Sequence, residues 1–377
     1  MTQNIVYSKI INPTDPGTLQ SAILAANQQE RLDSVTIAPG IYRIPFNDHP
    51  NANLLFTNLR NFVINANGVT LVMLDNRKRG MVFYGCYNVT VRDALTIRND
   101  IIPFSQGHSE SINQRSFVTN IDDGYPRTLD NSTYFPVATA YYVFDRNTRQ
   151  LKDKSYDYYS TGISRIDHRR FEVMFNDNLG GSVAIGDLVS MRGKGDFGII
   201  SEICELMNFI DVHLEFAGLF AWFETEGKGN NRYERISARP GPKPIGATTE
   251  PLMSSNADGF HSASVHRGPT ILNSFFTRMA DDGIAINGEY QFIRQVNGKI
   301  VICMKLNTNL NGNIFPNDII SNINHTGSGY VLRGNFILNH RARGILVKAL
   351  DGLIESNKID GSSMAGIVMQ PELWWGE

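Results

Sequence analysis

The sequence predicts an all-β protein whose chain forms a solenoid, and two observations carry this prediction. Short apolar runs recur between Asn and Gly residues at a fixed period: Asn335 and Asn357 lie 22 residues apart, as do Gly344 and Gly366. The composition, with 33 Gly, 21 Phe and 14 Tyr in 377 residues, also suits a turn-rich β protein with aromatic stacks inside. A period of about 20–30 residues is typical of solenoids, in which each repeat buries its apolar face against its neighbours.

The first part of the chain supplies the start of such a solenoid. Residues 15–27 have the pattern of a capped amphipathic helix, and residues 34–44 that of an alternating strand interrupted by a Pro-Gly turn. A short helix can cover the open end of a solenoid, where apolar side chains would otherwise face water. Further strand-and-turn units are expected at 62–65, 69–72, 81–84, 89–91 and 95–97.

The repeat pattern of the sequence is interrupted twice. From about residue 117, alternating strands follow one another without the 22-residue period, which predicts an inserted small antiparallel β-barrel. A shorter version of the same plan begins at about residue 288. The predicted organisation is an N-terminal cap with the first repeats (1–116), the barrel (117–193), repeats with the candidate site (194–287), a second short β insertion (288–325) and C-terminal repeats (326–377).

Charge and cysteine content exclude several classes of function. The net charge of −2, with 19% charged residues, gives no basic patch for a nucleic-acid or membrane-surface partner. No apolar run approaches the 18 residues of a transmembrane helix. Cys86, Cys204 and Cys303 have neither metal-site nor disulfide-framework spacing, so free thiols are expected. No signal peptide is visible, which leaves the compartment open: secreted or periplasmic if a signal has been removed.

Three aspartates, Asp258, Asp281 and Asp282, occupy the same place in neighbouring repeats. Asp258 precedes Gly259, and the pair Asp281-Asp282 precedes Gly283, 24 residues later (259 to 283). Stacked strands are about 4.8 Å apart, so we expect the carboxyl groups roughly 5–9 Å apart on one wall of the solenoid. Like charges this close do not all ionise easily, and at least one should keep its proton toward neutral pH. Acid/base cleavage of a glycosidic bond requires such a set of carboxyl groups.

The residues alone leave two other interpretations of these aspartates open. Asp before Gly is a common turn pair, because Asp tolerates turn geometry and bonds its own backbone. The same oxygens could also form a calcium site. Three carboxylates in register favour the catalytic interpretation, for which no metal and no cofactor are expected.

Further residues are candidates for contacts with the substrate. His261 could bond a sugar hydroxyl or tune Asp258, while Arg267 and Arg343 could pair with the carboxylates and lower their pKa values. Asn287 is expected to face the same cleft. For each of these residues a structural role is the alternative. The predicted substrate-binding residues, including two tryptophans able to stack on a pyranose face, are His261, Arg267, Asn287, Arg343, Trp374 and Trp375.

Residues 254–262, 267–269 and 279–290 together resemble glycoside hydrolase family 110. The match is in type and spacing: an Ala-Asp turn is followed 23 residues later (258 to 281) by an Asp-Asp pair. The resemblance implies a right-handed parallel β-helix of the pectin-lyase type with inserted β-barrels, which for this length would have about 9–11 turns. It also implies an exo-acting, inverting α-1,3-galactosidase whose acid/base residues are the three aspartates. The second insertion is shorter than in that family.

Two alternative functions remain on the same predicted fold. Polygalacturonase-like enzymes also place one Asp before an Asp-Asp pair, but they add Gly-His-Gly and Arg-Ile-Lys motifs, which residues 339–344 and 347–348 match poorly. A non-catalytic glycan-binding or structural protein could keep the aspartates without their acid/base function. In each case the expected partner is an oligo- or polysaccharide. The oligomeric state is not specified by the sequence, and a homo-oligomer is compatible with it.

Overall fold

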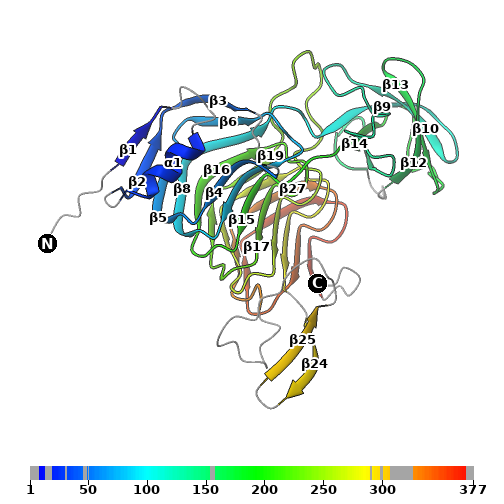
Figure 1. The fold of residues 1–377 in the computed structure, drawn as a ribbon. Coiled ribbons are helices and arrows are strands. Elements are labelled where there is room, and N and C mark those ends of the chain that lie inside the picture. Colours follow the sequence, from blue (N-terminus) through cyan, green and yellow to red (C-terminus); the bar gives the residue numbers. More distant parts are fainter. Residues whose placement is uncertain are drawn as a thin grey trace.

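The computed structural model describes residues 8–12, 19–29, 32–45, 49, 51–152, 158–288, 291–297, 300–305 and 326–370. Within these ranges the protein is all-β apart from one short helix, α1 (Leu19–Asn27). No helix in the same ranges is long and apolar enough to cross a membrane. Two large parallel sheets carry the body of the molecule, and a barrel projects beside them (Figure 1).

Each of the two large sheets consists of parallel strand pairs. The fifteen-stranded sheet, here called the long sheet, contains β1 (Ser8–Ile11), β2 (Ser34–Ile37), β3 (Gly40–Ile44), β5 (Arg60–Asn65), β6 (Val69–Met73), β8 (Tyr87–Asn99), β16 (Asn208–Glu215), β18 (Arg232–Glu234), β19 (Ser237–Arg239), β21 (Thr270–Leu272), β22 (Phe275–Thr277), β26 (Val331–Arg333), β27 (Phe336–His340), β29 (Leu353–Glu355) and β30 (Lys358–Ser362). The eight-stranded sheet, here called the short sheet, contains β4 (Ala52–Thr57), β7 (Arg79–Tyr84), β15 (Ile199–Glu202), β17 (Trp222–Thr225), β20 (Phe260–Ala263), β23 (Ile284–Asn287), β28 (Ile345–Lys348) and β31 (Ile367–Met369).

The chain returns to the same two sheets once per repeat. After β20 in the short sheet it contributes β21 and β22 to the long sheet, and then re-enters the short sheet as β23. Near the C-terminus the register follows the repeat of the sequence, because Phe336 pairs with Lys358 and Ile345 with Ile367. The all-β class and the parallel stacking of repeats agree with the prediction.

Asparagine recurs at one corner because its side chain joins successive repeats. The Oδ1 atom of Asn357 accepts hydrogen bonds from the backbone N–H and from the side-chain amide of Asn335, both at 2.9 Å. Asn335 in turn accepts one from the backbone N–H of Ser274 at 3.0 Å. Asn335 is fully buried. A buried side-chain amide that satisfies the turn backbone removes the cost of leaving those polar groups unpaired.

Glycine recurs at a second corner because the repeats touch there backbone to backbone. A Cβ atom on Gly259 would lie 2.7 Å from the carbonyl oxygen of Gly283, and one on Gly283 would collide with the carbonyl oxygen of Gly344. One on Gly344 would collide with that of Gly366 in the same way. Gly259 and Gly283 each directly follow an aspartate of the predicted site. This glycine column therefore sets how closely the site-bearing repeats stack.

Replacing Gly283 by alanine is expected to destabilise the protein by about 1–3 kcal/mol, because the added methyl group forces a packed backbone contact apart. Gly366 supplies the matched control, since its Cβ would find its nearest atom, Cγ2 of Ile359, at 3.9 Å. Gly366→Ala should change the unfolding free energy by less than about 0.5 kcal/mol. Urea unfolding of both variants tests this, and equal losses of stability would contradict the role given to the column.

Aromatic rings fill the space between the two sheets. Phe83 lies with its ring centroid 5.2 Å from that of Phe56 and 5.5 Å from that of Phe209. Phe209 stacks on Tyr233 at 5.4 Å, and Tyr233 meets Phe260 edge-on at 4.7 Å. These residues come from successive repeats, so the stack runs along the core. At the N-terminal end α1 buries its apolar side chains against β1, β2 and β4, in the place expected of a cap (Figure 1).

A closed antiparallel barrel interrupts the series of repeats between β8 and β15. Its strands are β9 (Phe104–Ile112), β10 (Ser116–Ile121), β11 (Ala140–Phe144), β12 (Tyr158–Arg165), β13 (Arg170–Phe175) and β14 (Leu188–Arg192). The barrel thus begins at β9, before the predicted boundary at residue 117. The sequence of β9 conceals this strand because buried Ser105 and Gln106 occupy positions where an apolar pattern would be expected.

The barrel is anchored to the repeats close to the predicted site. Its apolar core includes Phe216, Leu252, Met253 and Ala280 from the repeats. The side-chain amide of Asn256 donates to the carbonyl oxygens of Pro103 at 2.7 Å and Gly193 at 3.0 Å, one on each side of the barrel. Both connections of the barrel are therefore fastened two residues before Asp258.

Part of the second predicted insertion is an antiparallel hairpin of β24 (Gln291–Asn297) and β25 (Ile300–Lys305). Residues 306–325 of that insertion lie outside the described residues. Cys86 and Cys204 are buried free thiols, and the side chain of Cys303 lies outside the described part.

Candidate active site

The site stands where three successive repeats enter the short sheet. Asp258, Asp282 and Arg343 each precede a glycine of the column, and that glycine precedes β20, β23 or β28. The backbones are joined in register: Gly259 N–H donates to Asp282 O at 2.9 Å, and Gly283 N–H to Arg343 O at 2.9 Å. The same backbone geometry repeated three times places these three side chains in one row. Asp281 lies beside the row, one residue earlier.

The three carboxylates meet. One oxygen from each of Asp258, Asp281 and Asp282 lies within 4.8 Å of the other two. Asp258 and Asp282 are 4% and 2% exposed, whereas the side chain of Asp281 is 38% exposed. All three line a cavity of about 420 Å³. The nearest oxygens are therefore closer than the roughly 5–9 Å expected from strand stacking.

Each carboxylate oxygen of Asp258 has a hydrogen-bond partner. Its Oδ1 accepts the backbone N–H of Asp282 at 3.2 Å, and its Oδ2 lies 2.7 Å from Nδ1 of His261. Nε2 of His261 lies 2.9 Å from the amide nitrogen of Asn287. With Asn287 as donor, the proton of a neutral imidazole is on Nδ1 and points at Asp258. The ring of Phe220 stacks on the imidazole at 4.2 Å and fixes its plane.

Opposing effects act on the pKa of Asp282. Burial and the negative charge of Asp258 raise its pKa to about 6, against the lowering effect of Arg343. Arg343 donates from its backbone N–H to Oδ1 at 2.7 Å, and from Nη2 and Nε to Oδ2 at 2.7 and 3.2 Å. A carboxyl group that is half protonated near pH 6 fits the task of a general acid in mildly acidic to neutral solution.

Asp281 is the most accessible of the three carboxylates. Arg341 donates to its Oδ1 at 3.1 Å, across the same pair of repeats that Asp282 and Arg343 join. Its neighbour Ala280 is buried in the core of the barrel. The turn that carries Asp281 is therefore fixed on one side by the repeats and on the other by the barrel.

The outer face of the short sheet forms the floor of the cavity. Strand register aligns His261 with Ala285 and Leu346, and Asn287 with Lys348, and all five side chains line the cavity. The remaining lining residues outside the carboxylates and arginines are Tyr159, Phe220, Ala342 and Met364. Tyr159 is supplied by β12, so the barrel contributes directly to the site.

The charges around the cavity bear on the calcium interpretation. Arg341, Arg343 and Lys348 line the same cavity as the three aspartates, so the formal charges of the lining residues balance. A calcium site normally combines several oxygen ligands with an excess of negative charge. Two guanidinium groups bonded to two of the candidate ligands compete directly with a divalent cation. The donor set therefore suits a polar organic ligand better than calcium.

The structure brings together most, but not all, of the predicted residues. Asp258, Asp281, Asp282, His261, Asn287 and Arg343 line one cavity. Arg267 lies outside it: this residue is exposed, and its backbone pairs with Gly229 and Ser328 on the far side of β20. Arg267 is near Asp258 in the sequence, but the four-residue strand β20 lies between them, so the two residues stand in turns at opposite ends of that strand. Trp374 and Trp375 lie outside the described residues.

Among the aromatic and charged lining residues, four were not predicted to be in the site: Tyr159, Phe220, Arg341 and Lys348. Lys348 and Arg341 carried a usable signal, because Lys348 is aligned with Asn287 and Arg341 lies two residues before Arg343. Tyr159 carried none, since it reaches the cavity from the barrel.

Comparison with known proteins adds no assignment: no protein-family model matches the chain, and no curated protein matches it significantly.

Proposed function

We propose that this chain is a glycoside hydrolase, built on a right-handed parallel β-helix, that releases a terminal α-linked galactose or a closely related sugar. The observation that carries the proposal is the meeting of three carboxylates within 4.8 Å at one cavity, with the pKa of Asp282 raised to about 6. The cavity of about 420 Å³ falls within the range of small-molecule sites. The preference for an α-galactoside comes from the resemblance of residues 254–290.

The right-handed winding has a general physical basis. The strands of each large sheet are parallel, and the chain leaves and re-enters the sheet once per repeat. Connections between parallel strands of one sheet are right-handed in about 98% of cases, because twisted strands pack back onto the sheet only in that sense.

The two buried carboxyl groups divide the chemistry between them. Asp282, with its raised pKa, donates a proton to the oxygen of the leaving group. Asp258, which accepts hydrogen bonds from His261 and from the backbone N–H of Asp282, takes a proton from the attacking water. Asp281, the most accessible carboxylate, orients that water or a sugar hydroxyl. Arg343 stabilises the negative charge left on Asp282 after proton transfer.

The spacing of the carboxylates bears on the stereochemistry. Inversion usually needs carboxyl groups about 6.5–9.5 Å apart, and retention about 5–5.5 Å. Nearest oxygens within 4.8 Å are closer than the inverting range. The expectation of inversion therefore rests on the family resemblance alone.

A substrate screen tests the proposal. The purified protein is incubated with aryl α- and β-glycosides, α-galactosyl oligosaccharides and oligogalacturonides, and the first-formed anomer is followed by NMR. We expect turnover of an α-galactoside that persists in the presence of EDTA. Cleavage of oligogalacturonides alone would move the protein to the polygalacturonase-like alternative, and loss of activity with EDTA would restore the calcium interpretation.

Binding without turnover is the outcome that separates a non-catalytic glycan-binding protein from an enzyme. It is detected by calorimetry with the same oligosaccharides. If they bind but none is cleaved over a day at pH 5, 6 and 7, the hydrolase proposal is wrong.

A further inference from the structure

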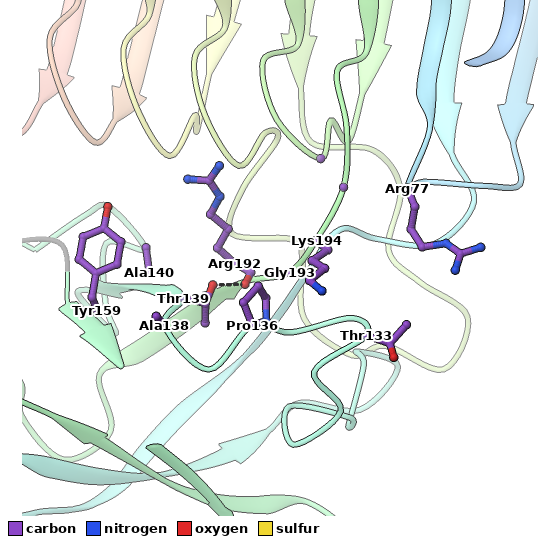
Figure 2. Close-up of a pocket in the computed structure, with 12 residues that line it drawn as sticks. Arg77, Thr133, Pro136, Ala138, Thr139, Ala140, Tyr159, Arg192, Gly193 and Lys194 are labelled. Carbon is purple, nitrogen blue, oxygen red and sulfur yellow. Dashed lines mark hydrogen bonds between the residues drawn. The ribbon is translucent and has the colours of Figure 1, made fainter. Parts of the chain in front are cut away.

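A second cavity, of about 570 Å³, lies where the barrel meets the repeats (Figure 2). Most of its wall comes from the barrel, chiefly from the connection between β10 and β11, and from the residues that follow β14. Its lining comprises Arg77, Thr133, Pro136, Ala138, Thr139, Ala140, Tyr159, Arg192, Gly193, Lys194, Gly195 and Gly218. This cavity is larger than the one that holds the carboxylates.

The wall of this cavity is fixed by hydrogen bonds. The hydroxyl group of Thr139 donates to the carbonyl oxygen of Arg192 (Figure 2). On the same strand exit, Gly193 N–H donates to Pro103 O at 3.0 Å, and Lys194 N–H donates to Tyr134 O at 2.7 Å. Because the backbone at 192–194 is held by hydrogen bonds at three points, the side chains of Arg192 and Lys194 start from defined positions.

The floor is made by two glycines in direct contact. A Cβ atom on either Gly195 or Gly218 would collide with the backbone of the other. Glycine at both positions brings the first residues after the barrel against the repeat that leads to β17. The absence of side chains at this contact also leaves room above it, so the same pair of residues joins the two parts and opens the cavity.

The charge of the lining is one-sided. Arg77, Arg192 and Lys194 line the cavity, and no acidic residue is among its lining residues in the described part of the chain. Arg77 is paired with Asp75, with Nε 3.1 Å from Oδ1. Within the described residues Arg192 and Lys194 form no ion pair with a carboxylate. Two cations without a counter-charge on the wall of a cavity attract an anion, and a guanidinium group can bind an oxyanion through two parallel hydrogen bonds.

Tyr159 lines both cavities. Tyr159 is 55% exposed, and its ring stands at the opposite side of the basic cavity from Arg77 (Figure 2). A ligand that enters the carboxylate cavity and extends past Tyr159 therefore reaches the basic one. An exposed aromatic ring at this junction suits a sugar, whose apolar face can pack against it.

We propose that the basic cavity is a subsite for an oxyanion, a sulfate ester or a carboxylate, carried by a sugar residue next to the one cleaved. This inference rests on the proposed glycosidase function and adds a substrate class to it: an anionic glycan rather than a neutral one. Tyr159 positions the sugar between the two cavities, and Arg192 and Lys194 bind its charged group.

Calorimetry with four probes tests this subsite: a neutral galacto-oligosaccharide, the same oligosaccharide with a sulfate ester, one with a uronate, and inorganic sulfate. The Asp282→Asn variant is the background, so that bound oligosaccharide is not cleaved. We expect at least one charged oligosaccharide to bind about tenfold more tightly than the neutral one at low ionic strength, the factor expected of a charge-assisted hydrogen bond. The preference should shrink as salt is added.

Arg192→Gln combined with Lys194→Gln should abolish the preference and leave neutral binding within about twofold. The matched control is Arg92→Gln with Lys358→Gln, which removes equal charge from the long sheet away from both cavities, and it should keep the preference. Equal binding of neutral and charged oligosaccharides would overturn the subsite. Inorganic sulfate that binds as tightly as the sulfated sugar would also overturn it, since the sugar would then play no part.

Failure of the subsite and failure of the proposed hydrolase function give different experimental results. If a charged oligosaccharide binds through Arg192 and Lys194 and the wild-type protein cleaves no glycoside, the subsite stands and the hydrolase proposal fails. If neutral α-galactosides are cleaved and charge makes no difference, the converse holds.

Discussion

Replacing Asp282 by asparagine is expected to lower kcat/KM for the cleaved glycoside by about 10²–10⁴-fold, the range typical of an acid/base residue. Asparagine keeps the size of the side chain but cannot deliver a proton. The side chain is 2% exposed and bonded by Arg343, so folding is tested separately by thermal unfolding. Asp360→Asn, at an exposed position of β30, is the control and should leave activity unchanged. Activity of Asp282→Asn within fivefold of wild type would remove Asp282 from the mechanism.

The pH dependence of kcat/KM tests the role of Asp282 independently. Burial and the charge of Asp258 raise the pKa of Asp282 to about 6, and the acid form is the active one, so kcat/KM should fall as pH rises through about 6. Arg343→Met removes a cation that lowers this pKa, and the alkaline limb should therefore move to higher pH. A limb that stays in place, or moves to lower pH, would show that Asp282 is not the group that titrates.

The row of Asp258 and Asp282 could be predicted from the sequence because both residues obey the local repeat. Each stands before a glycine at which neighbouring backbones touch, and a fixed backbone geometry translates sequence register into spatial register. The ion pair of Arg343 follows from the same rule one repeat later. Contacts between equivalent positions of successive repeats can thus be predicted from the sequence.

The remaining parts of the site come from outside that period. Tyr159 reaches the cavity because the barrel is fastened to the repeats by Asn256 and by a shared apolar core, and neither contact leaves a pattern in the sequence. Arg267 was misplaced for the opposite reason, since nearness along the chain does not show on which side of β20 a turn lies. Strand β9 was missed because its buried side chains include Ser105 and Gln106.

Glu224 also escaped prediction, and it bears on stability. Strand β17 alternates, so Glu224 points between the sheets like Trp222, two residues earlier. It is fully buried and accepts hydrogen bonds from Ser262 at 2.6 Å and from Asn231 and Tyr233 at 3.0 Å each. Burial raises its pKa from 4.5 to about 7 despite these donors. The carboxyl group is thus neutral in weakly acidic solution and becomes a buried charge above neutrality.

Wild-type protein is therefore expected to lose roughly 2–3 kcal/mol of stability from this one group between pH 5 and pH 8. The folded-state pKa lies above the unfolded value, so the contribution is complete below about 4.5 and is lost as pH rises through about 7. Glu224→Gln stays neutral, and its amide can still accept from Asn231 and Tyr233 and donate to Ser262. Urea unfolding should show the variant close to wild type at pH 5 and more stable at pH 8. Glu205→Gln, a surface residue paired with Lys228, is the control and should change stability by less than about 1 kcal/mol at both pH values. A Glu224→Gln variant that is less stable than wild type at pH 8 would mean that the ionised carboxylate is favoured in the core, contrary to the desolvation argument.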